Sequence, residues 1–191
     1  FLREDVDRES ALHLNMACES LILIDSLSKR VGVPGMRIGV FVTYNKQLAD
    51  QALKFAMSRS GTSRIEQRIS IPLLTDGEEL VKRNHAELQS RIDAMKDALR
   101  KIPDIQIYEP QGGMFVVIQI PGIDAQELLN FFIEEFRFNQ QTVSFLSLQD
   151  FYPSGDCGKQ NIRLAAVYAP TQLMQAIEIF QKGLAAFRQG R

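Results

Sequence analysis

The sequence predicts an α/β protein in which one long helix joins a first α/β part to a second α/β domain. Short apolar runs of strand length alternate with segments whose apolar residues recur every three or four positions, as on one face of a helix. The longest helical pattern covers residues 76–102. We therefore divide the 191 residues into a first part at 1–75, a connecting helix at 76–102 and a small C-terminal domain at 103–191.

The composition is that of a globular chain with balanced charge. The 22 Lys and Arg residues nearly cancel the 23 Asp and Glu residues, which gives no reason to expect nucleic acid or an anionic membrane surface as a partner. No apolar run approaches the roughly 20 residues of a membrane span. Cys18 and Cys157 form no metal-ligand pattern, so we expect reduced thiols, a cytoplasmic protein and no metal site.

The first part of the chain is expected to hold two strands followed by two helices. The unbroken apolar run 21–24 has the form of a strand that is covered on both faces, and the residues 37–43 are rich in β-branched and aromatic side chains. Asn45 is expected to cap a helix at 46–58, and a second helix is expected at 64–74.

The rest of the chain begins with the long helix, whose apolar residues recur at intervals of four and three. They are Leu88, Ile92, Met95, Leu99 and Ile102, and Pro103 ends the pattern. Strands are then expected at 105–108, 114–120, 142–148 and 161–167. Helices are expected at 125–136, capped by Asp124, and at 171–187.

Lys29 lies at the exit of the first apolar strand, where rigid backbone and apolar walls surround an amine. Partial desolvation at such a place lowers the pKa of a lysine and makes it a better nucleophile toward carbonyl groups. The nearby hydroxyls of Ser26 and Ser28 and the cation of Arg37 suit an anionic group such as phosphate. The alternative is that Lys29 and Arg37 are ordinary surface charges beside a junction between a strand and a helix.

Arg163 is the second cation of interest, because it lies inside an otherwise apolar strand. Burying a guanidinium is costly without an anionic partner. Ile162 and Leu164 point to the opposite face of the strand, so Arg163 can reach a cavity while its neighbours pack. Its planar fork suits a carboxylate, and the alternative is a structural salt bridge at the edge of a sheet.

The string around Lys29 resembles the lysine signature of the class I/II aminotransferases, which use pyridoxal phosphate. The matching residues are Ser26-Leu27-Ser28-Lys29, Gly32-Val33, Gly35 and Arg37-Ile38-Gly39. The resemblance implies that Lys29 forms the Schiff base with the cofactor and that Ser26, Ser28 and Arg37 hold its phosphate. The later string from Asn161 to Val167 resembles the element of this family in which an arginine, here Arg163, binds the substrate α-carboxylate.

The resemblance also implies a fold and a reaction. Residues 1–75 would be the C-terminal segment of a large cofactor-binding α/β domain of fold type I, in a protein that is a homodimer at full length. Lys29 would act as the proton-transfer base in a ping-pong transamination between an amino acid and a 2-oxo acid. The segment from Asp25 to Arg30 and the Phe151-Tyr152 loop look most like the aspartate-aminotransferase-like branch.

The resemblance covers only the C-terminal portion of the family. An acidic residue that pairs with the pyridine nitrogen and a tyrosine that bonds the ring hydroxyl stand upstream of the lysine in family members, and only 28 residues precede Lys29 here. The chain also begins at Phe1 without a Met. We therefore expect a piece of a longer polypeptide, whose 191 residues alone would not transaminate.

Two other functions remain open on the sequence. A pyridoxal-phosphate-dependent lyase or decarboxylase on the same scaffold would keep Lys29, Arg37 and Arg163. The other is a ligand-sensing domain of a transcription regulator that has the aminotransferase fold. It would require a basic helix-turn-helix upstream, and the net charge of −1 does not favour it.

Overall fold

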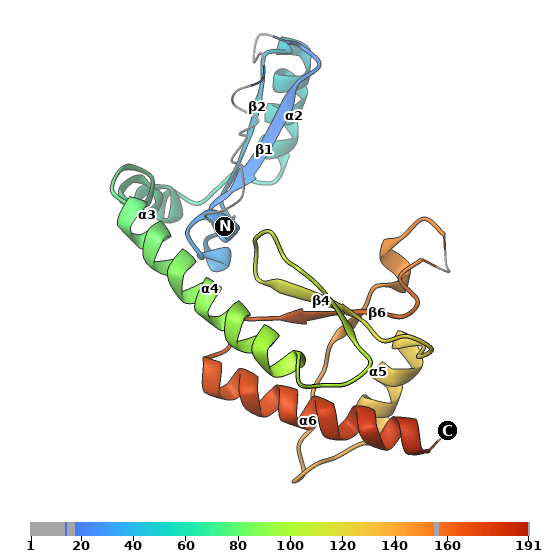
Figure 1. Cartoon of the computed structure of the whole chain (residues 1–191). Helices are drawn as coiled ribbons and strands as arrows, with labels where there is room; N and C mark the ends of the chain where they lie inside the picture. Colours follow the sequence, from blue (N-terminus) through green and yellow to red (C-terminus); the bar gives the residue numbers. More distant parts are fainter. Residues whose placement is uncertain (1–13, 15–17, 155–156, 191) are drawn as a thin grey trace. The chain divides into compact units, whose positions relative to one another are not determined.

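The computed structural model of the chain describes residues 14, 18–154 and 157–190. Helices and strands are mixed along the chain, which confirms the predicted α/β class (Figure 1). The chain forms two compact units, Phe1–Ala86 and Glu87–Arg191, and each is described by itself below. The domain limits at residues 75 and 102 stay a prediction.

The first unit holds a two-stranded antiparallel sheet and its flanking helices. Its elements are β1 (Ile22–Ser26), α1 (Leu27–Arg30), the 3₁₀ helix η2 (Pro34–Met36), β2 (Gly39–Thr43), α2 (Lys46–Ser58) and α3 (Arg64–Thr75). The register places Ile22 opposite Thr43. The backbone N–H of Leu48 donates to the Asn45 side chain at 3.0 Å, so the predicted cap of α2 is confirmed.

Two expectations for the first unit are wrong in detail. The strand predicted at 21–24 is not buried, since Ile24 is 77% exposed. The physical reason is that β2 is the only strand paired with β1 in the described part of the chain, and two strands cannot cover both of their own faces. The second strand starts at Gly39 rather than at residue 37, because Arg37 has a left-handed φ of 53°.

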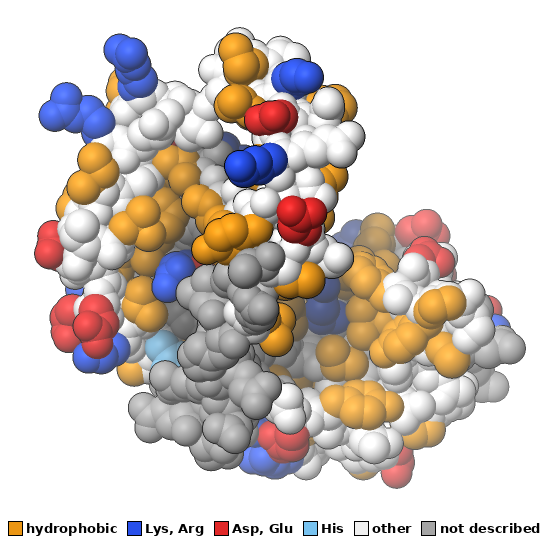
Figure 2. Space-filling view, turned by 90° about the horizontal axis from the view of Figure 1, so that it is seen from above, with side chains coloured by type: hydrophobic (Ala, Val, Ile, Leu, Met, Phe, Trp, Pro, Cys, Tyr) orange, Lys and Arg blue, Asp and Glu red, His pale blue; other side chains and the backbone are white. Residues whose placement is uncertain are grey.

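Large hydrophobic side chains lie exposed on every element of this unit except its two shortest helices. Hydrophobic side chains are visible on the surface in Figure 2. Those of the first unit include Ile22, Ile24, Val40, Phe41, Phe55, Met57, Ile65, Ile69, Ile71 and Leu74. Exposed apolar side chains gathered on one unit are typical of a surface that takes part in an interaction.

The second unit is built on a four-stranded sheet. Helix α4 (Glu78–Leu99) begins in the first unit and leads into β3 (Gln106–Tyr108), β4 (Phe115–Gln119), α5 (Ala125–Glu134), β5 (Leu146–Ser147), η3 (Gln149–Phe151), β6 (Asn161–Ala165) and α6 (Pro170–Gln189). The strand order is β3-β4-β6-β5, and every neighbouring pair is antiparallel. The N–H groups of Gln126 and Glu127 donate to Asp124, which confirms the predicted cap of α5.

The core of this unit lies between one face of the sheet and the helices α4, α5 and α6 (Figure 1). The apolar seam predicted on the long helix is confirmed, with Ile92, Met95, Leu99 and Ile102 buried and Leu88 packed against them. Alternate strand residues point into the same core, as a strand that is covered on one face requires. They are Val116 and Ile118 of β4 and Ile162 and Leu164 of β6.

Two expected elements are shorter than predicted. The helix expected at 76–102 runs from Glu78 to Leu99. The strand expected at 142–148 is reduced to Leu146–Ser147, because the chain diverges from β6 over residues 142–145. The boundaries of α5 and α6 differ from the expected ones by at most two residues.

Candidate active site

Lys29 projects from a one-turn helix that two buried residues hold in place. Leu27 is 5% exposed and Val31 is 3% exposed, and the N–H of Val31 donates to the carbonyl of Leu27 at 3.2 Å. Lys29 lies between these anchors and is itself exposed. The turn therefore fixes the backbone of the lysine and leaves its amine accessible.

The antiparallel pairing of β1 and β2 brings the residues before Lys29 against the residues after Arg37. Ser26 pairs with Gly39, and the N–H of Leu27 donates to the carbonyl of Ile38 at 3.2 Å. A Cβ at position 39 would lie 3.0 Å from the carbonyl oxygen of Asp25, so glycine permits this close approach. The two predicted phosphate-binding segments thus meet at one end of the two-stranded sheet.

Asn84 supports the lysine turn from a distant part of the same unit. Its Nδ2 donates to the carbonyl of Val31 at 3.2 Å, beside Gly32, which has a φ of +74°. Asn84 comes from α4 and lies 53 positions from Val31 in the chain. The sequence carries no signal for this contact, since Asn84 belongs to no motif around Lys29.

The cations beside the turn differ in their partners. Arg30 forms an ion pair with Asp25 at 3.1 Å. Lys29 and Arg37 have no carboxylate partner within the described ranges, and Arg37 donates one hydrogen bond to the carbonyl of Pro34. The hydroxyls of Ser26 and Ser28 make no hydrogen bond with any described residue. These side chains can therefore bind an external anion.

The desolvation that was expected to activate Lys29 is not provided by the described residues. Lys29 is exposed, and so is Arg37. Ile24 is exposed for the same reason, because the sheet of the first unit has only two strands in the described part of the chain.

Arg163 occupies the middle of β6 and is half-buried. Its neighbours Ile162 and Leu164 are buried in the core on the other face of the sheet, as the alternation of the strand predicts. Arg163 stands opposite Val117 of β4 and Leu146 of β5. The guanidinium is thus presented on the face of the sheet that the helices leave free.

Two phenylalanine rings contact the guanidinium of Arg163. Its Cζ atom lies 4.1 Å from the centroid of Phe115 and 5.4 Å from that of Phe151. No salt bridge to Arg163 occurs among residues 14, 18–154 and 157–190, so the alternative of a structural ion pair finds no partner there. Aromatic faces attract a cation without occupying its hydrogen-bond donors. The fork of Arg163 therefore remains available to a carboxylate.

Neither phenylalanine was predicted as a partner of Arg163, although the resemblance included the Phe151-Tyr152 loop. Phe115 stands opposite Ala165, so it lies diagonally across from Arg163 on the same face of the sheet. A predicted pairing of the strands 114–120 and 161–167, with its register, would have placed Phe115 beside Arg163. The sequence analysis predicted both strands but no register. Phe151 lies in η3, a short element that the sequence did not indicate.

The whole first unit and most of the second match one protein family. The sequence model described as "Aminotransferase class I and II" matches residues 1–180. The chain belongs to this family. Pyridoxal phosphate is the cofactor of these aminotransferases, and the lysine turn and the strand of Arg163 both lie inside the matched region.

Individual relatives in this family are identical to the chain at somewhat more than a quarter of the aligned positions. The (S)-3,5-dihydroxyphenylglycine transaminase of Amycolatopsis orientalis is 28% identical over 170 residues, covering 82% of this chain and 37% of the relative. The 1-aminocyclopropane-1-carboxylate synthase of Vigna radiata var. radiata is 28% identical over 128 residues, covering 61% of this chain and 34% of the relative. The chain therefore spans little more than a third of the length of these curated relatives.

Solved structures have the same fold over this portion of the family. The α-aminoadipate aminotransferase of Thermus thermophilus, complexed with N-(5'-phosphopyridoxyl)-L-leucine, superposes with a TM-score of 0.75 at 21% identity. The match covers 89% of this chain and 43% of that enzyme. At this identity the likeness establishes the fold.

Two further properties bear on the aminotransferase assignment. No described helix is both long and apolar enough to cross a membrane. The described residues also contain no cluster of three His, Cys, Asp or Glu side chains that could hold a metal ion.

Proposed function

We propose that this chain supplies the cofactor-bound lysine and the carboxylate-binding arginine of a pyridoxal-phosphate-dependent transaminase. Its substrates would be an amino acid and a 2-oxo acid, as in the aspartate-aminotransferase-like branch. The observation that supports this most is the lysine turn, in which Lys29 and Arg37 lack carboxylate partners among the described residues and stand beside two unengaged serine hydroxyls. Family membership over residues 1–180 supports it further.

The residues around Lys29 fit the cofactor by their chemistry. A phosphate dianion needs several donors, which the hydroxyls of Ser26 and Ser28 and the fork of Arg37 can provide. Lys29 would hold the cofactor through its aldehyde, since an accessible amine is a nucleophile toward carbonyl groups. When bound, pyridoxal phosphate supplies the electron sink that stabilises negative charge at the substrate Cα.

Lys29 would have a second role as the general base that moves the proton of the substrate Cα, with the cofactor bound beside it. Proton transfer of this kind contributes about 10²–10⁴-fold in rate. The fixed turn between Leu27 and Val31 keeps the lysine backbone in place throughout.

Arg163 binds and orients the substrate. Its fork makes two parallel hydrogen bonds to the α-carboxylate, and this contact sets the direction of the Cα–H bond that is broken. The rings of Phe115 and Phe151 contact the guanidinium and help to keep it in place.

The proposal includes a homodimer and a cytoplasmic location. The exposed apolar side chains of α2 and α3 support a covered surface in the working protein. Cys18 and Cys157 are both free and exposed, as in a reducing compartment.

The lyase reaction is the second candidate, since one of the relatives is a 1-aminocyclopropane-1-carboxylate synthase. Product analysis separates the two. The longest form of the protein that its gene encodes is loaded with pyridoxal phosphate and given a panel of amino acids, with and without 2-oxoglutarate. Transamination yields equimolar glutamate and a new 2-oxo acid, and only with 2-oxoglutarate present. Turnover that needs no acceptor would assign a lyase and contradict the proposal.

A further inference from the structure

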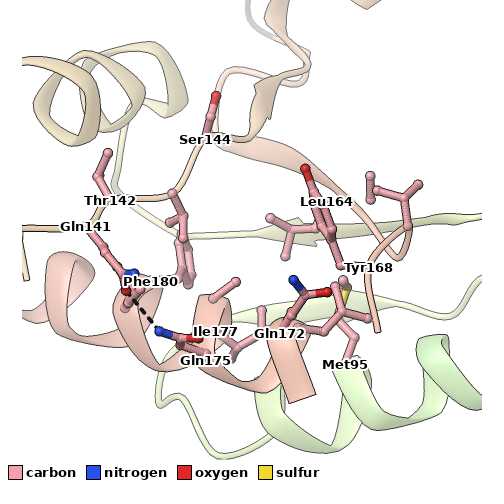
Figure 3. Close-up of a pocket in the computed structure, with 16 residues that line it drawn as sticks. Met95, Gln141, Thr142, Ser144, Leu164, Tyr168, Gln172, Gln175, Ile177 and Phe180 are labelled. Carbon is pink, nitrogen blue, oxygen red and sulfur yellow. Dashed lines mark hydrogen bonds between the residues drawn. The ribbon is translucent and has the colours of Figure 1, made fainter. Parts of the chain in front are cut away.

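Lys96 of α4 is a buried charge that the proposed reaction does not use. Its residue is 4% exposed, and no other charged residue is buried among those that the structure describes. A lysine is almost never fully buried unless it is paired. Met95, the residue before it, lines a cavity beside α6 together with Leu164 of β6 (Figure 3). Lys96 therefore projects from a part of α4 that is packed into the core of the second unit.

The partner of Lys96 is Glu109, whose two carboxylate oxygens both contact cations from the end of α4. Its Oε2 accepts a hydrogen bond from the amine of Lys96. Its Oε1 accepts one from the guanidinium of Arg100, which directly follows α4, at 3.1 Å. Glu109 itself directly follows β3. The ion pair therefore attaches the residue after β3 to α4.

The loop that begins at Glu109 leads to Phe115, whose ring contacts Arg163. We call residues 109–114 the β3–β4 loop. Val117 is the residue of β4 nearest to this loop that pairs with β3, so Phe115 lies between the loop and the paired part of β3 and β4. The pairing of β4 with β6 holds the backbone of Phe115 on one side. On the side toward β3, its position depends on the β3–β4 loop.

We propose that Lys96 and Glu109 are positioning residues for the substrate carboxylate. Their ion pair fixes the start of the β3–β4 loop on α4, and the loop keeps the ring of Phe115 over the guanidinium of Arg163. The ring in turn keeps the guanidinium in the orientation that receives a carboxylate. The inference rests on the proposed carboxylate role of Arg163, and it assigns no substrate contact to Lys96 or Glu109.

A role in stability alone would not require this ion pair. An apolar residue of similar size often serves a fold as well as a buried charge does, whereas an ion pair specifies one position for each partner. The two roles can be separated with Lys96→Met, which removes the buried charge and keeps a long side chain in its place. Glu109 then stays solvated, since its side chain is 55% exposed and Arg100 remains beside it.

The test compares substrate binding with stability in two variants of the longest expressed form, loaded with pyridoxal phosphate. Lys96→Met is expected to keep a urea unfolding midpoint close to that of the unchanged protein. Its KM for the amino acid should rise about two- to fivefold with a nearly unchanged kcat. Gly183→Ala, which places a methyl group against the buried Phe132, should do the opposite and lower the midpoint without changing the KM.

Two further measurements connect the effect to the β3–β4 loop and to Phe115. The amides of residues 111–114 should exchange with solvent about tenfold faster in Lys96→Met, with β6, which is paired on both sides, as the internal reference. In the background of Phe115→Leu, Lys96→Met should change the KM by less than about 1.5-fold, because both substitutions act through the same ring.

The outcomes distinguish this inference from the proposed function. An unchanged KM and unchanged loop exchange in Lys96→Met, together with a raised KM in Arg163→Ala, would overturn the inference and leave the proposed function standing. Additive effects of Lys96→Met and Phe115→Leu would overturn it as well, and so would a KM that rises with lost stability in Gly183→Ala. An unchanged KM in Arg163→Ala would overturn the proposed carboxylate site and this inference with it.

Discussion

The guanidinium of Arg163 lies over the ring of Phe115, with 4.1 Å between Cζ and the ring centroid. The two residues come from neighbouring antiparallel strands and share the face of the sheet opposite the core. A cation over an aromatic face is worth about 0.5–2 kcal/mol, depending on how far it is desolvated. Phe115 thus holds the guanidinium in place without competing for the hydrogen bonds that a carboxylate would receive.

Replacing Phe115 is expected to weaken substrate binding more than it slows the reaction. Phe115→Leu removes the aromatic face, so the KM for the amino acid should rise about three- to tenfold with a nearly unchanged kcat, whereas Phe115→Tyr should restore the wild-type value. Steady-state kinetics of the longest expressed form measure both parameters. Equal KM values for the leucine and tyrosine variants would contradict a role for the ring.

Substitution of Arg37 and of Arg163 is expected to have different effects. Arg37→Ala removes a proposed phosphate contact, so it is expected to weaken retention of pyridoxal phosphate during dialysis. Arg163→Ala removes the proposed carboxylate contact, so it is expected to raise the KM for amino acids while the cofactor stays bound. Absorbance of the bound cofactor and steady-state kinetics give the two readouts. A loss of cofactor alone in both variants would show that the division of roles is wrong.

Gly183 of α6 lies against Phe132 of α5. A Cβ at this position would lie 2.3 Å from Cζ of the fully buried Phe132. Gly183→Ala should therefore destabilise the protein by about 1–3 kcal/mol, although alanine favours a helix. The matched control is Gly190→Ala, where the nearest atom would be 3.6 Å away and the change should stay within about 0.5 kcal/mol. Urea unfolding followed by circular dichroism compares them, and equal midpoints would refute the packing argument.

Glu109 gives the second unit an acid-sensitive contact. Its carboxylate accepts a hydrogen bond from the buried Lys96, which lowers the pKa of Glu109 below its ordinary value of 4.5, and Arg100 adds to the effect. Because the folded pKa is depressed, the stabilisation is present above pH 4.5 and is lost as the pH falls through the folded pKa. Glu109→Gln should remove this part of the acid dependence and lower the free energy of unfolding at neutral pH, since the buried Lys96 loses its anionic partner.

The control for this prediction is an ion pair at the surface. Lys82 also lowers the pKa of Glu78, but that carboxylate is fully exposed and leaves no buried charge behind when it is removed. Unfolding midpoints between pH 3 and pH 7 should therefore change much less for Glu78→Gln than for Glu109→Gln. Equal changes in the two variants would mean that the burial of Lys96 does not matter.

Local patterns predicted the helices better than the burial of the strands. The seam from Ile92 to Ile102 and the caps at Asn45 and Asp124 depend on neighbouring residues, and all three are confirmed. The burial of a strand depends on which other segments cover its two faces. The residues 21–24 carry no information about those segments. Ile24 is therefore exposed although its sequence context is that of a buried strand.

In the candidate site too, features set by neighbouring residues were predicted and features set by distant residues were not. The signature around Lys29 is contiguous, and its two segments meet through the pairing of Ser26 with Gly39. Asn84 and Phe115 come from distant segments, and no sequence motif connects them to Val31 or Arg163. Their contributions follow from strand register and helix position, which a single sequence does not specify.

Covalent labelling of Lys29 tests the central claim most directly. The longest expressed form of the protein is incubated with pyridoxal phosphate, reduced with borohydride, digested and mapped by mass spectrometry. We predict a phosphopyridoxyl group on Lys29 and its loss in Lys29→Ala, while Lys54→Ala, which changes an exposed lysine of α2, keeps the label. A label on another lysine, or no label at all, would contradict the assignment.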